Sequence, residues 1–548
     1  MTADPATTSD SLATDDATRS GAARGGVIAA IVIIAAIWIS LWPALKCGFT
    51  VRDDNHTVAQ NPDLKPPSIN GVLRYWKWPA WGLYTPVTYT VWAGVALLSP
   101  QPALPGQSYE LNPMHFHATN LIVHTLAALV IWLVLKRLFD SNWAACAGAL
   151  LFALHPVQID SVAWVSGLKD VLAGFFAVTA IWQYLISADE SIDASDRKVH
   201  YALCIVATCA AVLSKVSAAM LPGILLLIDW LLLRRPPRQI LRGVIPVFLF
   251  CLPTMIGARF IQHPESLIAF WQRPILVLFT LTFYAMKVAW PAALAPDWGL
   301  PPQVAIKVSW IWACWIIPLA VAIVLFIVRR RRPELAAGVL IFVVSILPVL
   351  GFLPFGYQID STVAEHYLYL AMFGAALAAA GTLARTRSPL AWAAAAIVLV
   401  ALGIRSHQQT WHWRDTFTLF THNANLTPNN WRPRNHIGLG LMERKDLKGA
   451  EEQFRRSIAI EPTHVNYGNL AGIRLAQGDI REAIEDREQA VALKPDLALT
   501  HAQLAEVYLR ADRPADAEAS ARRALDLAPD EPRATRVLAD ALKRQGKR

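Results

Sequence analysis

The sequence predicts an all-α protein in which a polytopic membrane domain of about 11 spans is followed by a tetratricopeptide-repeat α-solenoid. Of its 548 residues, 55% are hydrophobic and only 17% are charged, which is far too apolar for a soluble chain of this length. Long apolar runs recur up to about residue 404, and none follows. Beyond that point prolines return every 33 or 34 residues, the period of a helix–turn–helix repeat.

The chain opens with residues 1–26, whose Thr, Ser, Ala and Asp content predicts a disordered cytoplasmic tail. The run 27–45 is too long and bulky for the core of a signal peptide, so we expect an uncleaved first span. It opens the expected transmembrane domain, 27–404, whose spans are placed at 27–45, 116–135, 143–158, 169–187, 200–214, 216–233, 241–260, 308–328, 336–354, 363–383 and 389–404.

Short basic clusters beside these runs predict the orientation, because Lys and Arg are enriched in cytoplasmic loops. With the N-terminus inside, the clusters that fall on the cytoplasmic side are Lys136-Arg137, Arg234-Arg235, Arg329 to Arg332, and Arg385 with Arg387. The apolar region 275–290 would reverse this order if it crossed alone, so we expect it to be interfacial or re-entrant, or to have a partner span that the sequence does not reveal. The repeats then lie outside, and the Ala- and Arg-rich composition favours a bacterial inner membrane with periplasmic repeats. The net charge of +9 lies largely in these clusters and does not indicate nucleic-acid binding.

The first outer loop, 46–115, is long and aromatic. Its Trp and Tyr residues, with Arg74 and Lys77 at partly helical spacing, predict helices that lie in the membrane interface. A loop resting on the membrane and the wall of a lipid-facing groove would both have this composition. The six cysteines fall mostly inside apolar segments, without metal-type pairs, so we expect no disulfide framework.

Unusual polar residues gather in the outer loops and at the span ends beside them. They are Asp53, Asp54, His115, His117, His155, Asp160, Lys169, Asp170, Lys215, Glu365 and His366. The inner span ends hold little beyond basic clusters, so this asymmetry predicts a site that opens to the outer face. Adjacent acids on an extended segment point to opposite sides, so Asp53 and Asp54 need not share a role. On their own they are better explained as solvated carboxylates or as a helix cap.

Several of these residues also have purely structural interpretations. His117 and His124 share a helix face, but no third ligand has the spacing of a metal site, and packing beside Asn120 explains them better. For the charged residues the alternative is structural ion pairing, of Lys169 with Asp170 and of Glu365 with His366 or Lys215.

The C-terminal domain, 405–548, is predicted from its internal repeat. Prolines recur at Pro428, Pro462, Pro495 and Pro529, and small residues keep step with them: Gly438, Ala471 and Ala505; Ala450, Ala483 and Ala517; Ser457, Ala490 and Ala524. Small side chains at these positions let paired helices approach closely. We expect a half-repeat at 409–428, repeats at 431–462, 464–495 and 498–529, and a capping helix at 532–547. Arrays of this kind mostly bind peptides or proteins.

The order of motifs along the chain resembles a known family. After the acidic pair come NPMHFHATNLIVH, FALHPVQIDSVAWVSGLKDVL, VLSKVSAAMLPGILLLIDW, EHYLYLAMFG and the repeats. This order is similar to that of the transmembrane and tetratricopeptide-repeat O-mannosyltransferases of the GT-C superfamily, over about residues 27–545, and HPVQIDSVAWVSGLKD is its most specific part. The resemblance implies a GT-C-like membrane domain that moves mannose from a polyprenyl-phosphate donor to a hydroxyl of a protein acceptor on the outer face.

The resemblance also implies roles for individual residues. Asp53 and Asp54 match the catalytic acidic motif, with Asp53 expected as general base and Asp54 as a residue that positions the acceptor or the loop. The residues expected to meet the donor phosphate and sugar are Lys169, Lys215, His366, Glu365, His155 and Asp170, and those expected to support the outer loop are His117, Asn120 and His124. One displacement with one base predicts inversion at C1. No metal or cofactor is implied beyond the lipid-linked sugar.

The chain departs from the family at positions that often carry arginine. Leu168, His366 and Thr85 stand at such positions, and Val216 replaces a proline. Arginine binds phosphate through a bidentate fork and histidine does not, so these changes bear on the donor's identity and on the pH dependence of its binding.

Two other classes of protein fit parts of the sequence. A non-enzymatic scaffold could recruit envelope proteins through the repeats, and a transporter could move a lipid-linked glycan. A transporter would carry polar residues in mid-span, and these spans have few. A scaffold needs neither the acidic pair nor the aromatic outer loop.

Overall fold

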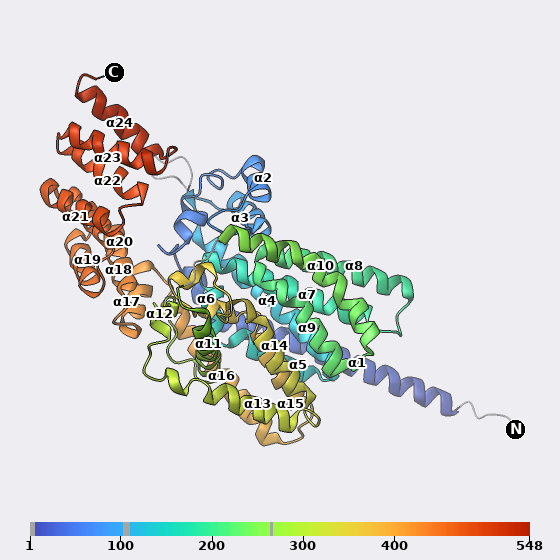
Figure 1. The fold of residues 1–548 in the computed structure, drawn as a ribbon. Helices are drawn as coiled ribbons and strands as arrows, with labels where there is room; N and C mark the ends of the chain where they lie inside the picture. The colour runs from blue at the N-terminus through green and yellow to red at the C-terminus, as the bar shows by residue number, and fades with distance from the viewer. Residues whose placement is uncertain (1–5, 102–109, 263–266, 548) are drawn as a thin grey trace. The chain divides into compact units, whose positions relative to one another are not determined.

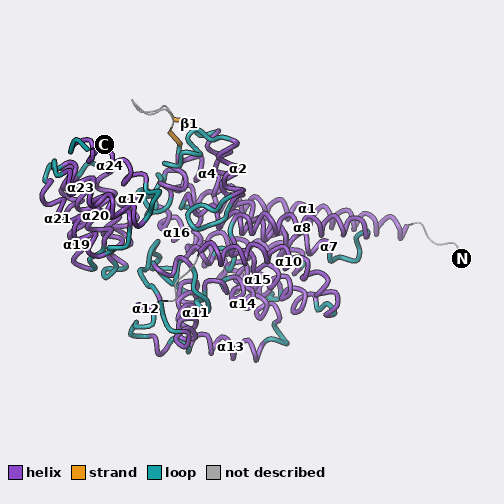
Figure 2. The backbone as a smooth tube through the Cα atoms, turned by 45° about the horizontal axis from the view of Figure 1, so that its top comes forward, coloured by secondary structure: helices purple, strands orange, loops and turns teal. Residues whose placement is uncertain are grey.

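The computed structural model describes residues 6–101, 110–262 and 267–547. Nearly all of its regular structure is helical, beside a short antiparallel ladder of β1 (Pro100–Gln101) with β2 (Glu110–Leu111) (Figure 2). The chain divides into two compact units, one made of Met1–Pro296 and Leu300–Arg414 and the other of Asp297–Gly299 and Asp415–Arg548. The predicted all-α class, with a helical array after the apolar part, is confirmed.

The first unit holds helices α1 to α16 (Figure 1). They are α1 (Ala6–Leu41), α2 (Ile69–Lys77), α3 (Pro86–Leu97), α4 (Pro113–Phe139), α5 (Asn142–Leu154), α6 (Ile159–Val162), α7 (Leu168–Ser187), α8 (Ala194–Ser214), α9 (Leu221–Leu227), α10 (Pro237–Gln262), α11 (Arg273–Ala289), α12 (Pro302–Ala305), α13 (Ile316–Val328), α14 (Pro333–Ser345), α15 (Met372–Ala384) and α16 (Pro389–Trp411). Of the expected tail, residues 1–5 lie outside the described residues, and 6–26 belong to α1 where the composition predicts disorder. The boundary predicted at 404 falls inside α16.

In the described part of the chain, eight helical segments are long and apolar enough to cross a membrane: Arg24–Lys46, Pro113–Phe139, Val165–Ser187, Ala194–Ser214, Val216–Leu233, Pro237–Gln262, Ile311–Val328 and Pro389–Trp411. Each matches a predicted span. The predicted span 143–158 is instead a helical pair bent by 49°, with Pro156 at the break.

Two predicted spans are shorter in the structure. The spans expected at 336–354 and 363–383 are reduced to α14 and α15, which have 13 residues each. Tight turns at Leu347–Val349 and Glu365–Leu368 interrupt the apolar runs, the first of them at Pro348. The region 275–290 falls in α11, a helix of 17 residues, and its relation to the membrane stays a prediction.

The centre of the first unit lies at α4, α5 and α7. In the candidate span Val165–Ser187, 78% of the most apolar stretch is buried inside the protein, whereas in Ile311–Val328 only 11% is buried. α7 packs against α8 and α4, and α5 packs against α4 and α15 (Figure 1). The segments that precede α4 and α7 therefore adjoin the most buried helices of the unit.

Local sequence signals set where these central helices begin. Asn112 caps α4 by accepting a hydrogen bond from the Met114 N–H, and Pro113 follows at the first helical position. Before α7 the chain makes a tight turn at Gly167, where an added Cβ would run into the Ser161 carbonyl oxygen. This turn fixes the places of Ser166 and Lys169 on its two sides.

The second unit is a row of paired helices. They are α17 (Thr416–Leu426), α18 (Trp431–Glu443), α19 (Leu447–Ile460), α20 (His464–Gln477), α21 (Ile480–Leu493), α22 (Ala498–Arg510), α23 (Pro514–Leu527) and α24 (Pro532–Arg544). Each predicted repeat contains one such pair. Eight of the nine small residues that keep the period have exposures of 1% or less: Ala450, Ser457, Ala471, Ala483, Ala490, Ala505, Ala517 and Ala524. Because these positions are buried between neighbouring helices, larger side chains there would push the helices apart.

Two helical glycines of this unit allow a matched test of its packing. A Cβ at Gly438 would lie 2.6 Å from Cε1 of Phe454, whereas one at Gly472 meets nothing within 4 Å. We expect Gly438→Ala to lower the free energy of unfolding by about 1–3 kcal/mol through overpacking. Gly472→Ala should raise it by about 0.5–1 kcal/mol, because alanine favours the helix. Thermal unfolding of the full-length protein in detergent measures both, and equal shifts would contradict the packing described.

Candidate active site

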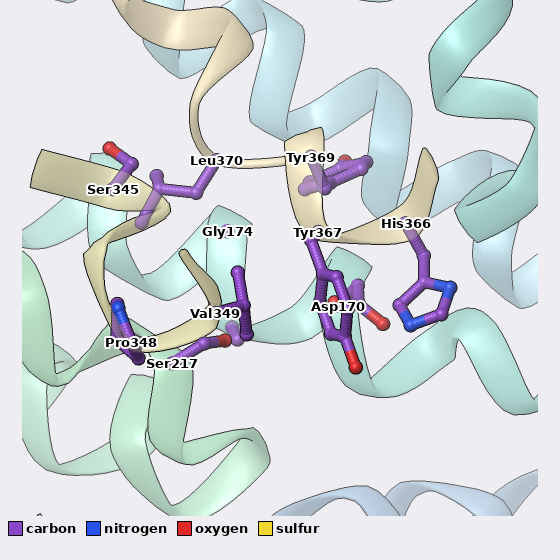
Figure 3. Close-up of a pocket in the computed structure, with 12 residues that line it drawn as sticks. Asp170, Gly174, Ser217, Ser345, Pro348, Val349, His366, Tyr367, Tyr369 and Leu370 are labelled. Carbon is purple, nitrogen blue, oxygen red and sulfur yellow. The ribbon is translucent and has the colours of Figure 1, made fainter. Parts of the chain in front are cut away.

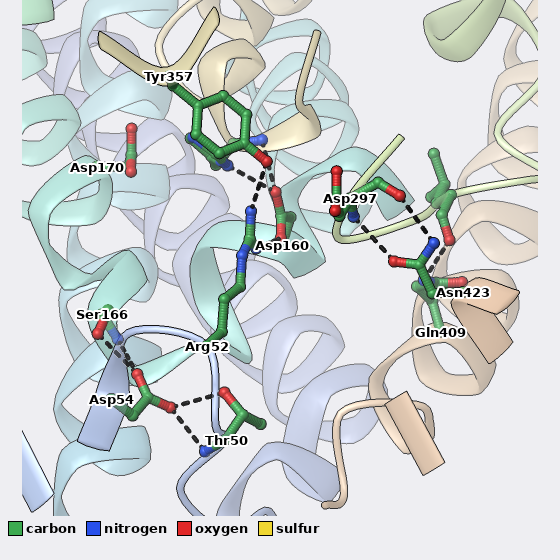
Figure 4. A network of polar contacts seen from close by, with 12 residues as sticks. Thr50, Arg52, Asp54, Asp160, Ser166, Asp170, Asp297, Tyr357, Gln409 and Asn423 are labelled. Atoms are coloured by element: carbon green, nitrogen blue, oxygen red, sulfur yellow. Dashed lines mark hydrogen bonds and ion pairs between the residues drawn. The ribbon is translucent and has the colours of Figure 1, made fainter. Parts of the chain in front are cut away.

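Asp54 ties the loop after the first span to the start of α7 (Figure 4). Its buried carboxylate accepts hydrogen bonds from the backbone N–H and the hydroxyl of Thr50, at 3.0 and 2.9 Å, and from those of Ser166, at 2.9 and 2.7 Å. Burial raises the pKa of Asp54, and the hydrogen bonds from Thr50 and Ser166 oppose that rise. Both oxygens are thus occupied by the protein itself, which is the arrangement of a structural tie.

The neighbouring carboxylate has a different environment. Asp53 lines a cavity of about 170 Å³, and Lys169 lines the same cavity. Among the described residues the Asp53 carboxylate has no hydrogen bond, and the buried Lys169 ammonium has no ion pair, although it lies 5.5 Å from the ring centroid of Trp164. One carboxylate without a hydrogen bond and one ammonium without an ion pair among the described residues therefore line the same cavity.

Arg52 is a site residue that the sequence did not single out (Figure 4). Its guanidinium lies 3.3 Å from Oδ1 of Asp160, donates to the Tyr357 hydroxyl at 3.3 Å and covers the Trp164 ring at 4.3 Å. Oδ2 of Asp160 accepts the backbone N–H of His366 at 3.0 Å and lies 2.8 Å from its Nδ1. His366, expected beside the donor phosphate, is thus engaged by Asp160. The only sequence signal for Arg52 is its place next to the acidic pair.

Lys215 and Asp170 form a second buried pair. The Lys215 ammonium donates to both oxygens of Asp170, at 2.6 and 2.8 Å, and lies 5.4 Å from the ring centroid of Tyr367. Asp170 therefore pairs with Lys215. The alternative of a local ion pair between Lys169 and Asp170 is wrong. Asp170, His366 and Tyr367 border a small cavity of about 20 Å³ (Figure 3), which has room for about one water molecule.

The histidines of α4 and their neighbour are packed and hydrogen-bonded. His117 Nε2 lies 3.3 Å from the Gly48 oxygen, His124 Nδ1 lies 2.9 Å from the Tyr369 hydroxyl, and Asn120 donates to the carbonyls of Val162 and Trp164 at 3.3 and 2.7 Å. Asn120 is buried in the same helix as the two histidines, but its amide hydrogen-bonds the chain before α7 and not the histidine rings. Within the described ranges, no group of three His, Cys, Asp or Glu side chains could hold a metal ion.

Two expected site residues lie apart from both cavities. His155 Nε2 is 3.0 Å from the Val288 oxygen, at the end of α11, and Glu365 is 1% exposed. Neither residue lines a cavity with Asp53 or with Asp170. The residues expected to act on the donor thus fall into three places. Asp53 and Lys169 line one cavity, Asp170, Lys215 and His366 belong to ion-paired groups, and His155 and Glu365 lie outside both cavities.

Comparison with known proteins agrees with the order of motifs. Protein O-mannosyl-transferase TMTC3 of Homo sapiens is 24% identical over 600 residues, covering 90% of this chain and 64% of that protein. Protein O-mannosyl-transferase F38B6.6 of Caenorhabditis elegans is 23% identical, over 79% of this chain and 63% of that protein. The chain is similar to protein O-mannosyl-transferases. It spans about three fifths of the length of these relatives. No protein-family profile matches it.

Solved structures offer distant likenesses. ArnT from Cupriavidus metallidurans bound to undecaprenyl phosphate is 14% identical, with 86% of this chain and 80% of that chain covered and a TM-score of 0.35. The Archaeoglobus fulgidus oligosaccharyltransferase in the apo form is also 14% identical, with 71% and 55% covered and a TM-score of 0.40.

The two acids should respond differently to the same change. In Asp54→Asn an amide N–H₂ would face a donor of Thr50 or Ser166, so we expect a loss of about 1–3 kcal/mol in the free energy of unfolding. Asp53→Asn disturbs no side-chain hydrogen bond with the residues that the structure describes, so its free energy of unfolding should stay within about 0.5 kcal/mol of the parent. Thermal unfolding in detergent compares the two, and equal unfolding temperatures would refute the tie.

The two lysines give a second contrast. Lys215→Met leaves the buried Asp170 carboxylate without its partner, so we expect a loss of about 3–5 kcal/mol. The double change Lys215→Met with Asp170→Leu should recover much of it. Lys169→Met removes a buried charge that has no ion pair among the described residues, and should not lower stability. Chemical unfolding of the four proteins decides this, and a loss in Lys169→Met equal to that in Lys215→Met would contradict the assignment.

Proposed function

We propose that this chain is a membrane glycosyltransferase that moves mannose from a polyprenyl-phosphate donor to a hydroxyl of a protein acceptor, on the outer face of a bacterial inner membrane. The observation that carries this proposal is the shared cavity of Asp53 and Lys169. The cavity is lined by a carboxylate and an ammonium, and neither group makes a hydrogen bond or an ion pair within the described residues. Sugar transfer from a lipid phosphate needs both groups.

In the proposed reaction the acceptor oxygen attacks C1 of the sugar while its proton passes to the Asp53 carboxylate. The bond between C1 and the phosphate oxygen breaks, and its electron pair leaves with the phosphate. The Lys169 ammonium stabilises the charge that develops there. Because one displacement takes place at C1, the product is inverted.

The buried pairs around the cavity support a division of labour. Lys215 compensates Asp170, while Arg52 and His366 surround Asp160. Without these partners two buried carboxylates would repel a donor phosphate. We therefore assign Lys169 the direct contact with the phosphate, and Lys215 and His366 the task of neutralising acids near it. In this proposal the helical repeats of the second unit receive the acceptor protein.

The proposal is tested by changing Asp53 while leaving the fold intact. We expect Asp53→Asn to lower kcat by about 10²- to 10⁴-fold, because the acceptor hydroxyl loses its base. Asp63→Asn is the matched control, since Asp63 lies in the same loop and contacts Arg74 and Tyr75 but does not line the cavity. Transfer of radiolabelled mannose from a short-chain polyprenyl phosphate in proteoliposomes is measured. Full activity in a normally folded Asp53→Asn protein would refute the base.

A further inference from the structure

A tight turn with an unusual residue borders the cavity of Asp53 and Lys169. Ala80 and Leu83 exchange two backbone hydrogen bonds of 2.9 Å, and the two residues between them, Trp81 and Gly82, have φ angles of 53° and 73°. Positive φ at both central positions defines a type I′ turn, which favours Asn-Gly or Gly-Gly. Glycine fits this geometry, whereas a bulky tryptophan in the left-handed region is an outlier. Backbone strain of this kind concentrates at functional sites.

The strained residue holds its ring at the cavity. Trp81 is 67% exposed, and its ring centroid lies 5.1 Å from that of His56, with 39° between the planes. Both residues line the cavity with Asp53 and Lys169. A large apolar ring is therefore kept in contact with water, at a backbone cost, beside the two groups of the proposed reaction.

An unsatisfied hydroxyl lies on the same cavity. Thr85 is 4% exposed, and its Oγ1 has no hydrogen-bond partner among the described residues. A buried polar group without a partner is costly and needs an explanation. A ligand hydroxyl would supply the missing hydrogen bond.

From these observations we infer that the cavity takes the pyranose ring of a hexose, with Trp81 as the platform on which the ring stacks. The C–H groups on one face of a pyranose carry slight positive charge and suit the negative face of an indole. The cavity of about 170 Å³ is close in size to the ~150 Å³ that holds a benzene ring in an engineered protein. Thr85 and His56 offer polar groups to the ring hydroxyls, as specific sugar sites require.

The inference rests on the proposed function in one respect: it takes the hexose to be the sugar of the lipid-linked donor, held between Asp53 and Lys169. Other tryptophans of the loop do not share this placement. The Trp76 indole N–H donates to Thr90 at 3.0 Å, and Trp78, which is 69% exposed, does not line the cavity. Trp78 therefore provides a matched control, because it is an exposed tryptophan of the same loop that lies outside the cavity.

The test uses a change that suits the turn but removes the ring. Trp81→Asn creates the Asn-Gly pair that type I′ turns favour, so the unfolding temperature should not fall. Binding to the full-length protein in nanodiscs is measured by calorimetry with three probes: a short-chain polyprenyl phosphate carrying mannose, the same lipid phosphate without sugar, and methyl α-mannoside. The variants compared are Trp81→Asn, Thr85→Val and, as control, Trp78→Asn.

We expect Trp81→Asn to weaken binding of the sugar-bearing lipid about tenfold, as the loss of one aromatic contact implies. Thr85→Val should weaken the same probe, while binding of the sugar-free lipid and all binding to Trp78→Asn should stay unchanged. If both lipids bound the parent and Trp81→Asn weakened them equally or not at all, the platform would be wrong while the proposed donor stood.

The third probe separates the platform from the donor. If the parent bound neither lipid but held methyl α-mannoside in a manner that depends on Trp81, the hexose site would stand, and the sugar would come from a glycan acceptor in place of the proposed donor. If the parent bound none of the three probes, both the platform and the proposed function would be overturned.

Discussion

The four hydrogen bonds to the Asp54 carboxylate are the constraint on which the rest of the site depends. They join a loop that follows the first span to the turn before α7, two segments more than a hundred residues apart in sequence. Because Ser166 lies one helical turn before Lys169, the same bonds set the relation of Lys169 to Asp53. A flexible loop would leave the relation of Lys169 to Asp53 undefined, and the Asp53 carboxylate would then spend most of its time in water.

The second constraint on the site is that its buried acids are neutralised by basic side chains. The acids Asp160 and Asp170 are each matched by a cation from a distant segment. Pairs as buried as these add little to stability, since desolvation offsets much of the attraction. Their effect is instead to remove negative potential from the region around Lys169, so that an anion arriving there meets a net attraction.

The positions of the helices could be predicted from the sequence, whereas most of the side-chain pairs at the candidate site could not. The long apolar helices and the paired repeat helices could be predicted because apolar runs and the 34-residue period are visible in short stretches of the sequence. The shortening of α14 and α15 depends on individual turns inside apolar segments, which periodicity does not detect. The gathering of polar residues on the outer face stays a prediction from charge asymmetry, whereas the pairing of His366 with Asp160 joins residues 206 positions apart and has no sequence signal. Arg52 could not be predicted as a site residue because a single arginine in a polar loop carries no spacing or periodicity that indicates its partners.

The Trp81-Gly82 turn has a bearing on how such a chain would diverge. A residue that opposes its own backbone geometry is kept only while something else selects for its ring. If Trp81 stacks on a hexose as proposed, a descendant that lost this ligand would drift at this position toward asparagine or glycine, which the turn accepts without strain. The identity of one turn residue would then record whether a descendant keeps the proposed hexose site, even where the surrounding helices no longer reveal it.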